Sequence, residues 1–137
     1  MHDLDLVDAA WQAREHAHAP YSNYQVGVAL ATTEGKIFTG CNVENASYPC
    51  CLCAEATAIG KAVSEGGMKP GGLAAIAVAV DTNKPAPPCG KCRQIIEEFA
   101  AEDARVLLSS KRGEIVHEFN HKELLPFSFN GTNLDET

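Results

Sequence analysis

Cysteine is the residue type whose spacing in this 137-residue chain most clearly suggests chemistry. The six cysteines form two clusters and an outlier at position 41. Cys89 and Cys92 form a C-x-x-C pair at the start of one predicted helix, and Cys53 lies at the start of another. Zinc prefers a tetrahedron of sulfur and nitrogen ligands, and a catalytic zinc site keeps one position open for water. The sequence therefore predicts one zinc ion held by Cys53, Cys89 and Cys92.

Glu55 is the only carboxylate inside either cysteine motif. Two residues along a helix correspond to a rotation of about 200°, so Cys53 and Glu55 cannot share a helix face. They can still converge if the metal lies beyond the helix end, near its axis. A carboxylate there can take a proton from zinc-bound water and pass it to a leaving group. Glu55 is therefore the predicted catalytic acid and base.

Two other interpretations of the cysteines remain open at this stage. Cys50 or Cys51 could supply a fourth ligand, which would make the site a structural zinc centre without catalysis. The C-x-x-C pair could also be redox-active. A thioredoxin-type site is less favoured, because no predicted strand leads directly into this pair.

Composition and charge exclude several classes of protein. Hydrophobic residues make up 45% and charged residues 21%, which are ordinary values for a globular protein. The 18 acidic and 11 basic residues give a formal charge of −7, which repels nucleic acid and anionic lipid. No apolar stretch approaches the roughly 20 residues that a membrane helix needs, and the N-terminus lacks a signal-peptide pattern. We therefore expect a single cytoplasmic domain over 1–137 that binds neither nucleic acid nor membranes.

Hydrophobic periodicity and turn residues predict the elements that must position the cysteines. The segment 73–80 is almost continuously apolar, which indicates a strand buried on both faces. Helices are predicted over 4–18, 53–66, 90–101 and 121–125, strands over 24–33, 37–40, 73–80, 105–109 and 114–119, and loops over 42–52 and 83–88. This order predicts an α/β fold, a three-layer α/β/α sandwich with a mixed sheet of about five strands.

Several motifs together resemble one family. Cys53-Ala54-Glu55 followed by P-C-x-x-C is the signature of zinc nucleoside deaminases. Four blocks, one of which extends the P-C-x-x-C motif, match in the family's order: P-Y-S-N-Y-Q-V-G at 20–27, G-C-N-V-E-N-A-S-Y at 40–48, P-C-G-K-C-R-Q at 88–94 and L-L-P-F-S-F at 124–129. The chain thus resembles the small homotetrameric zinc-dependent cytidine deaminases over nearly its whole length.

The resemblance implies roles for individual residues. Cys53, Cys89 and Cys92 would hold zinc, and Glu55 would shuttle protons. Asn42 and Glu44 would bind the ribose 3′-hydroxyl. The backbone of Ala54 would contact the pyrimidine ring, and Tyr24 would pack against the base or sugar. Three residues would lie at subunit contacts that complete a neighbour's pocket: Ala46, Tyr48 and Phe127. A homotetramer follows from the same resemblance.

The chain departs from the family pattern beside the metal. Tetrameric members usually read S-Y-G-x-x-x-C-A-E-R, whereas this chain has two extra thiols, Cys50 and Cys51, and Ala56 at the arginine position. Arg93 is expected to support the second cysteine pair through its charge. Without the family resemblance, these and other residues have ordinary structural interpretations. Asn42 and Glu44 would be solvated loop residues, and Tyr24 and Phe127 would be core aromatics. Cys41 would be a small buried residue, and four histidines would lie on the surface: His16, His18, His117 and His121.

These inferences predict hydrolytic deamination of cytidine and 2′-deoxycytidine to the corresponding uridines, with release of ammonia. One alternative is a related deaminase that acts on a modified cytosine or a cytosine-bearing antibiotic. The other is a non-catalytic zinc-binding protein in which cysteines fill all four metal positions.

Overall fold

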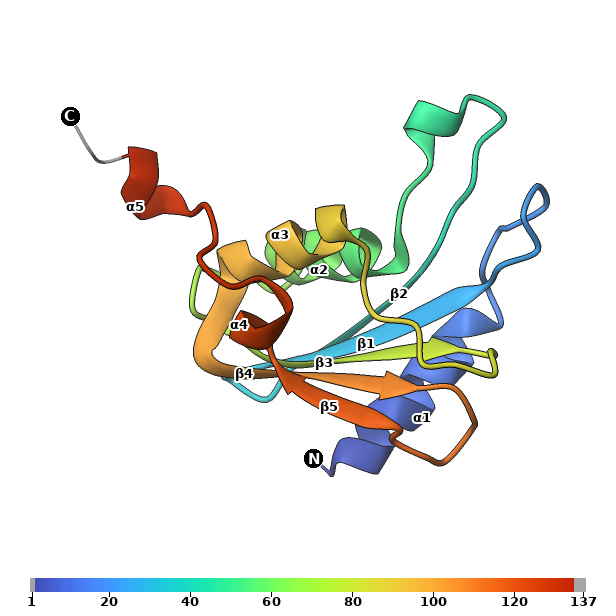
Figure 1. Ribbon diagram of the computed structural model, residues 1–137, viewed down its shortest axis with the longest axis horizontal. Coiled ribbons are helices and arrows are strands. Elements are labelled where there is room, and N and C mark those ends of the chain that lie inside the picture. Colours follow the sequence, from blue (N-terminus) through green and yellow to red (C-terminus); the bar gives the residue numbers. More distant parts are fainter. Residues whose placement is uncertain (1, 135–137) are drawn as a thin grey trace.

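The computed structural model describes residues 2–134 and contains, within them, a five-stranded mixed sheet in the order β2-β1-β3-β4-β5 (Figure 1). The strands are β1 (Val26–Thr32), β2 (Ile37–Cys41), β3 (Leu73–Val80), β4 (Ala100–Ser109) and β5 (His117–Asn120). The helices are α1 (Asp3–Arg14), α2 (Ala54–Ser64), α3 (Gly90–Phe99), α4 (His121–Leu124) and α5 (Gly131–Leu134), with a 3-10 turn at Tyr48–Cys50. The pair β3–β4 is parallel and the other neighbours are antiparallel, so the predicted mixed sheet is confirmed.

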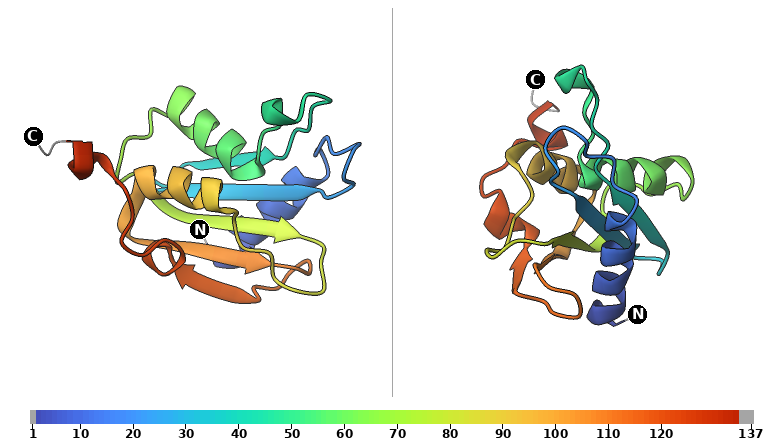
Figure 2. Two further views of the ribbon diagram at one scale, coloured as in Figure 1. Left: turned by 45° about the horizontal axis from the view of Figure 1, so that its top comes forward. Right: turned by 90° about the vertical axis from the view of Figure 1, so that its right-hand side faces the viewer.

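Helices cover both faces of this sheet (Figure 2). On one face, α1 packs against alanines of the central strands. On the other face, α2 and α3 pack against larger aliphatic side chains. Strand β3 shows the cause, because its side chains alternate between Ala75, Ala77 and Ala79 toward α1 and Ile76, Val78 and Val80 toward α2 and α3. The three-layer α/β/α architecture predicted from the sequence is therefore confirmed.

The first helix ends earlier than its apolar pattern predicts. It ends at Arg14 rather than His18, because the chain at His18 pairs with the 42–44 loop instead. The backbone N–H of His18 donates to the Asn42 carbonyl at 3.0 Å, and the N–H of Glu44 donates to the His18 carbonyl at 2.7 Å. Tertiary pairing thus overrides a local helical pattern.

Other boundaries also moved. Strand β4 begins at Ala100 rather than at residue 105, since Ala100 pairs with Leu73 of β3 and ends α3 at Phe99. Strand β5 begins at His117 rather than at residue 114. Helix α5 was not expected from the sequence.

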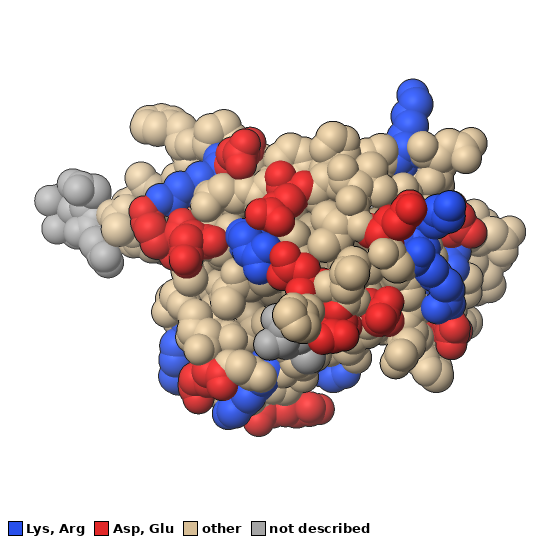
Figure 3. Space-filling model, turned by 90° about the horizontal axis from the view of Figure 1, so that it is seen from below, with Lys and Arg blue, Asp and Glu red and all other residues tan. Residues whose placement is uncertain are grey.

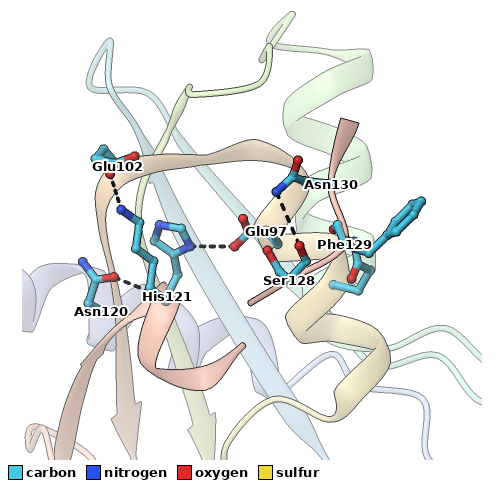
Figure 4. Close-up of polar contacts among 9 residues, drawn as sticks. Glu97, Glu102, Asn120, His121, Ser128, Phe129 and Asn130 are labelled. Carbon is cyan, nitrogen blue, oxygen red and sulfur yellow. Dashed lines mark hydrogen bonds and ion pairs between the residues drawn. The ribbon is translucent and has the colours of Figure 1, made fainter. Parts of the chain in front are cut away.

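The prediction that His121 lies on the surface is wrong. Its side chain is buried, with Nδ1 3.0 Å from Oε2 of Glu97 on α3 (Figure 4). The hairpin of β4 and β5 brings α4 back against α3, which no local pattern announces. Its Nε2 atom is buried without a hydrogen-bond partner in the described part of the chain.

The surface carries charged side chains of both signs. On the face seen from below, acidic and basic side chains are intermingled (Figure 3). Within residues 2–134, no helix has both the length and the apolar character that crossing a membrane requires.

Candidate active site and metal centre

The three predicted zinc ligands converge at one end of the sheet. The sulfur atoms of Cys53, Cys89 and Cys92 all lie within 4.8 Å of one another. Three sulfur ligands of one tetrahedral zinc, with Zn–S bonds of about 2.3 Å, would lie about 3.8 Å apart, which is within this limit. Among the described residues, only these three form a group that could hold a metal ion. The donor set therefore fits one zinc ion.

Two helix N-termini position these thiols. Cys53 is the N-cap residue of α2 and Cys89 is the N-cap residue of α3, while Cys92 lies in the first turn of α3 and is buried. The positive ends of the helix dipoles therefore face the sulfur cluster and favour negative charge there. Both cysteines of the C-x-x-C motif therefore belong to one cluster with Cys53.

The electrostatics of the cluster explain why it needs a cation. Burial raises the pKa of the Cys92 thiol and that of the Cys53 thiol. Burial also acts to raise the pKa of Cys89, but hydrogen bonds from the Cys92 backbone and from the Cys92 and Cys53 thiols lower it overall. Two of the three thiols thus resist ionisation by themselves, and a bound divalent cation would stabilise them as thiolates.

Glu55 lies in the first turn of α2 with only 5% of its surface exposed, and it lines the same pocket as the cysteines. Burial raises the pKa of its carboxyl group, although its own backbone N–H and the Cys92 thiol partly oppose the shift. Cys53 has extended backbone angles (φ −74°, ψ 151°), so its side chain leaves the helical spiral. This is why two residues that cannot share a helix face converge beyond the helix end.

The pocket that contains the cluster has a volume of about 420 Å³. That size is within the range of small-molecule sites, and its walls are mainly apolar. Val26 at the start of β1 pairs with Val80 at the end of β3, and both line the pocket beside the two helix starts. Glu44 and Glu55 are its carboxylates, and no lysine or arginine stands among the described lining residues.

Asn42 and Glu44 both line this pocket, and both also hold the 21–26 segment. The Asn42 side chain accepts from the backbone N–H of Val26 at 2.9 Å and donates to the carbonyl of Tyr24 at 2.7 Å. Glu44 accepts from the backbone N–H groups of Tyr21 and Ser22 at 3.0 and 3.2 Å. The Ser22 hydroxyl also donates to Glu44, and these hydrogen bonds lower the pKa of its carboxyl group. The side chains that are expected to recognise the sugar therefore also hold the 21–26 segment in place.

The other four predicted substrate-binding residues occupy different places. Ala54 is buried in the first turn of α2 and lines the pocket, as does the exposed Tyr24. Tyr48 instead lines a neighbouring cavity of about 330 Å³ and meets Tyr21 edge-to-face. Phe127 is fully exposed, with a positive φ of 49°, and lines neither cavity. The interpretation of Tyr24 and Phe127 as core aromatics is therefore wrong.

The extra thiols do not join the metal cluster. Cys51 Sγ accepts from the N–H of Asn45 at 3.3 Å and lies 3.7 Å from the Asn45 carbonyl. Cys50 is exposed in the 3-10 turn. The fourth ligand that a structural site would need is thus not supplied by either residue.

Sequence reasoning missed Thr57. Its hydroxyl lies 2.8 Å from the carbonyl oxygens of both Cys41 and Cys53, so it joins the end of β2 to the N-terminus of α2. Serine and threonine side chains commonly bond to the carbonyl four residues earlier in a helix. The spacing of Thr57 from Cys53 could therefore have revealed one of these contacts, but not the contact with Cys41.

Comparison with known proteins places these features in a family. Residues 1–108 match the family model described as the cytidine and deoxycytidylate deaminase zinc-binding region. The cytidine deaminase of Halalkalibacterium halodurans is 45% identical over 131 residues, which cover 96% of each chain. That of Sporosarcina psychrophila is 43% identical over 129 residues, covering 94% of this chain and 92% of that one.

Solved structures agree with this result. The crystal structure of cytidine deaminase from Burkholderia pseudomallei has a TM-score of 0.87 and 47% identity, and covers 94% of this chain and 100% of that one. The enzyme from Mycobacterium tuberculosis has a TM-score of 0.79 and 33% identity, with coverage of 94% and 98%.

The fold and the site together define an α/β protein with a zinc centre beside a buried carboxylate. The chain belongs to the zinc-dependent cytidine deaminase family, and zinc is its cofactor. Neither a non-catalytic zinc protein nor a deaminase for another cytosine compound is favoured by these relatives.

Proposed function

We propose that this protein hydrolyses cytidine and 2′-deoxycytidine to uridine and 2′-deoxyuridine and releases ammonia. The observation that carries the proposal is the position of the buried Glu55 carboxylate in the same pocket as the three-cysteine cluster. When bound, zinc makes water a strong nucleophile near neutral pH by lowering its pKa.

Glu55 supplies the proton transfers of this reaction. Its carboxylate takes the proton of the attacking water and delivers it to ring N3 of the cytosine. The same carboxylate then helps to protonate the amine that leaves C4. General acid–base groups of this kind contribute about 10²–10⁴-fold to a rate. The buried position of Glu55 keeps these transfers away from bulk solvent.

The charge of the pocket favours a nucleoside over a nucleotide. Two glutamates line it, and no lysine or arginine does so in the described residues. A 5′-phosphate would enter without a cationic partner, which is unfavourable in an apolar pocket. Asn42, Glu44, Tyr24 and Ala54 all line this pocket, which supports roles for them in substrate binding. In the proposed complex, Asn42 and Glu44 bind the ribose 3′-hydroxyl, Tyr24 packs against the base or sugar, and the backbone of Ala54 contacts the pyrimidine ring.

We further propose that the protein is a homotetramer. Large aromatic side chains are exposed on the single chain, among them Tyr48, Phe127 and Phe129. Such side chains are enriched in interfaces between proteins. Tyr48 and Phe127, together with the exposed Ala46, would complete a neighbour's pocket. Light scattering would then give four times the 14.6 kDa mass of one chain.

The single domain over 1–137 and the cytoplasmic location stay predictions from the sequence. Expression of a fluorescent fusion in the native host would test the location. Limited proteolysis that leaves one resistant fragment of nearly full length would support the single domain.

An ammonia-release assay on a panel of nucleosides tests the central proposal. The panel contains cytidine, 2′-deoxycytidine, their 5′-monophosphates, 5-methylcytidine and adenosine. We expect turnover of the first two and much lower kcat/KM for both monophosphates. Zinc-loaded protein that releases no ammonia from cytidine would refute the proposal, and preference for 5-methylcytidine would redirect it to modified cytosines.

A further inference from the structure

The side chain of Arg93 lies between the metal-ligand loop and the C-terminal part of the chain. Its Nε donates to the carbonyl of Pro88 at 2.8 Å, and its Nη1 donates to the carbonyl of Leu124 at 3.0 Å. Pro88 is fully buried and directly precedes the zinc ligand Cys89. The backbone N–H of Arg93 also donates to the Cys89 carbonyl at 2.9 Å. That last bond is the ordinary helical one that any residue at 93 would make, so the Arg93 side chain itself acts on the carbonyl that precedes Cys89.

Leu124 belongs to a stretch of chain, residues 121–130, that we call the 121–130 segment. Two other residues of α3 also contact this segment. Gln94 Nε2 donates to the carbonyl of Phe129 at 2.8 Å. Oε2 of Glu97 lies 3.0 Å from Nδ1 of His121 (Figure 4). Contacts at 93, 94 and 97 thus anchor the segment along the length of the helix that carries Cys92.

The geometry requires the shape of an arginine and not only its charge. The planar guanidinium presents several N–H donors in a fixed fork, so one side chain can reach two carbonyl groups at once. A lysine ammonium is a single point at the end of a flexible stem and cannot reproduce that bridge. Both acceptors of the Arg93 side chain are backbone carbonyls rather than cysteine sulfurs. This differs from the sequence-based expectation that Arg93 acts through its charge.

We propose that Arg93 is a positioning residue that holds Cys89 in its metal-binding geometry and connects it to the 121–130 segment. This inference rests on the zinc site of the proposed function. Groups that orient metal ligands from outside the ligand set typically contribute 10- to 100-fold to metal affinity when they are replaced. Loss of the bridge should therefore be visible as faster loss of zinc.

The experiment measures the rate at which a chromogenic chelator in excess removes zinc from the folded protein, with thermal unfolding followed in parallel. Arg93→Lys keeps the charge, and Arg93→Gln removes it. Lys91→Gln is the matched control, because Lys91 is an exposed cation in the same helical turn. We expect zinc release about 10- to 100-fold faster in both Arg93 variants and an unchanged rate in the control.

A second set of variants tests the connection to the 121–130 segment. Glu97→Ala removes the partner of His121 and should speed zinc release in the otherwise unchanged protein. If the segment acts through Arg93, the same change should add nothing when Arg93→Gln is already present. Full additivity of the two changes would overturn the connection.

The outcomes separate this inference from the proposed function. Wild-type release rates in Arg93→Lys would assign the role to charge and overturn the positioning proposal. Equal rates in Arg93→Gln and Lys91→Gln would overturn it as well. If the unaltered chain bound no zinc, the metal site and the proposed function would fail instead. Circular dichroism of each variant establishes that the compared proteins are folded, and Arg93→Lys is the conservative variant if Arg93→Gln does not fold.

Discussion

The two faces of the sheet are built from different side chains and perform different tasks. The face under α1 presents mostly alanines, and α1 lies so close that Gly27 of β1 has no room for a side chain. The face under α2 and α3 presents larger aliphatic residues and, at one end, the cysteine cluster and Glu55. Close packing of small residues stabilises the first face, whereas the second accepts a buried carboxyl group for chemistry.

The two faces therefore differ in the property that a substitution alters most. A buried ionisable group costs free energy unless it is paired, and such groups concentrate at functional sites. On the α1 face, the buried polar contact is a neutral one, from the Trp11 ring N–H to the Ser109 hydroxyl at 2.8 Å. Changes at the close-packed residues of the α1 face should therefore alter unfolding, and changes at the cysteine cluster or Glu55 should alter turnover or zinc binding.

The largest expected effect is on the site face. Glu55→Gln keeps the size of the side chain but removes its ability to accept and return a proton. We expect kcat to fall by about 10⁴-fold, since one carboxylate performs several transfers. Zinc content and the unfolding midpoint should stay close to those of the unaltered protein. Near-normal kcat in a zinc-loaded variant would show that another group moves the proton.

The second effect is on the α1 face. A Cβ atom at Gly27 would lie 2.0 Å from the Ala10 carbonyl oxygen and 2.5 Å from the Arg14 backbone nitrogen. Gly27→Ala should therefore push α1 away from the sheet and lower the free energy of unfolding by about 3 kcal/mol, measured in urea. Zinc content per folded chain should be unchanged.

Gly60→Ala is the control for that measurement. Gly60 lies within α2, and a Cβ atom there meets open space. Alanine is the better helix former, so this change should raise the free energy of unfolding by about 0.5–1 kcal/mol. Equal effects at both glycines would contradict the close approach of α1.

A smaller effect is expected from the ion pair that ties α1 to β4. Both Arg105 Nη atoms lie 2.8 Å from the Asp3 carboxylate oxygens, and this hydrogen-bonded contact lowers the pKa of Asp3. Because the pair is about 40% exposed, Asp3→Asn should lower the free energy of unfolding by at most about 1 kcal/mol at pH 7.

The pH dependence of this ion pair follows from the direction of the shift. A carboxyl group whose pKa is lower in the folded state stabilises the protein above its unfolded pKa of about 3.9. That contribution is lost as the pH falls through the folded pKa. The difference between the unaltered protein and Asp3→Asn should therefore shrink as the pH falls below the unfolded pKa of Asp3, and it should also shrink in high salt. A difference that grew on acidification would contradict the assignment.

The smallest effect is expected for the two extra thiols on the site face. Cys50 and Cys51 lie outside the metal cluster, and serine at 51 can make the same contacts with the Asn45 backbone. The double variant Cys50→Ser, Cys51→Ser should keep one zinc per chain. Its activation free energy for deamination should change by no more than about 0.5 kcal/mol. Loss of zinc would restore the structural-site interpretation.

Local patterns in the sequence determined much of this protein. The apolar run of β3, the helix after Cys53 and the helix after Cys89 were predicted because each depends on residues that are neighbours in the chain. The ligand set and Glu55 were predicted for the same reason, since zinc coordination limits which residue types and spacings can serve. The mixed sheet with helices on both faces followed from the order of the elements.

The remaining features depend on contacts between residues that are far apart in the chain. The end of α1 depends on the pairing of His18 with the 42–44 loop, and the burial of His121 depends on Glu97 of α3. The double role of Asn42 depends on the backbone of Tyr24 and Val26, and that of Arg93 depends on Leu124. In each case the partner lies far along the chain. Backbone groups and side chains find such partners only when packing brings the elements together, so no local pattern encodes them.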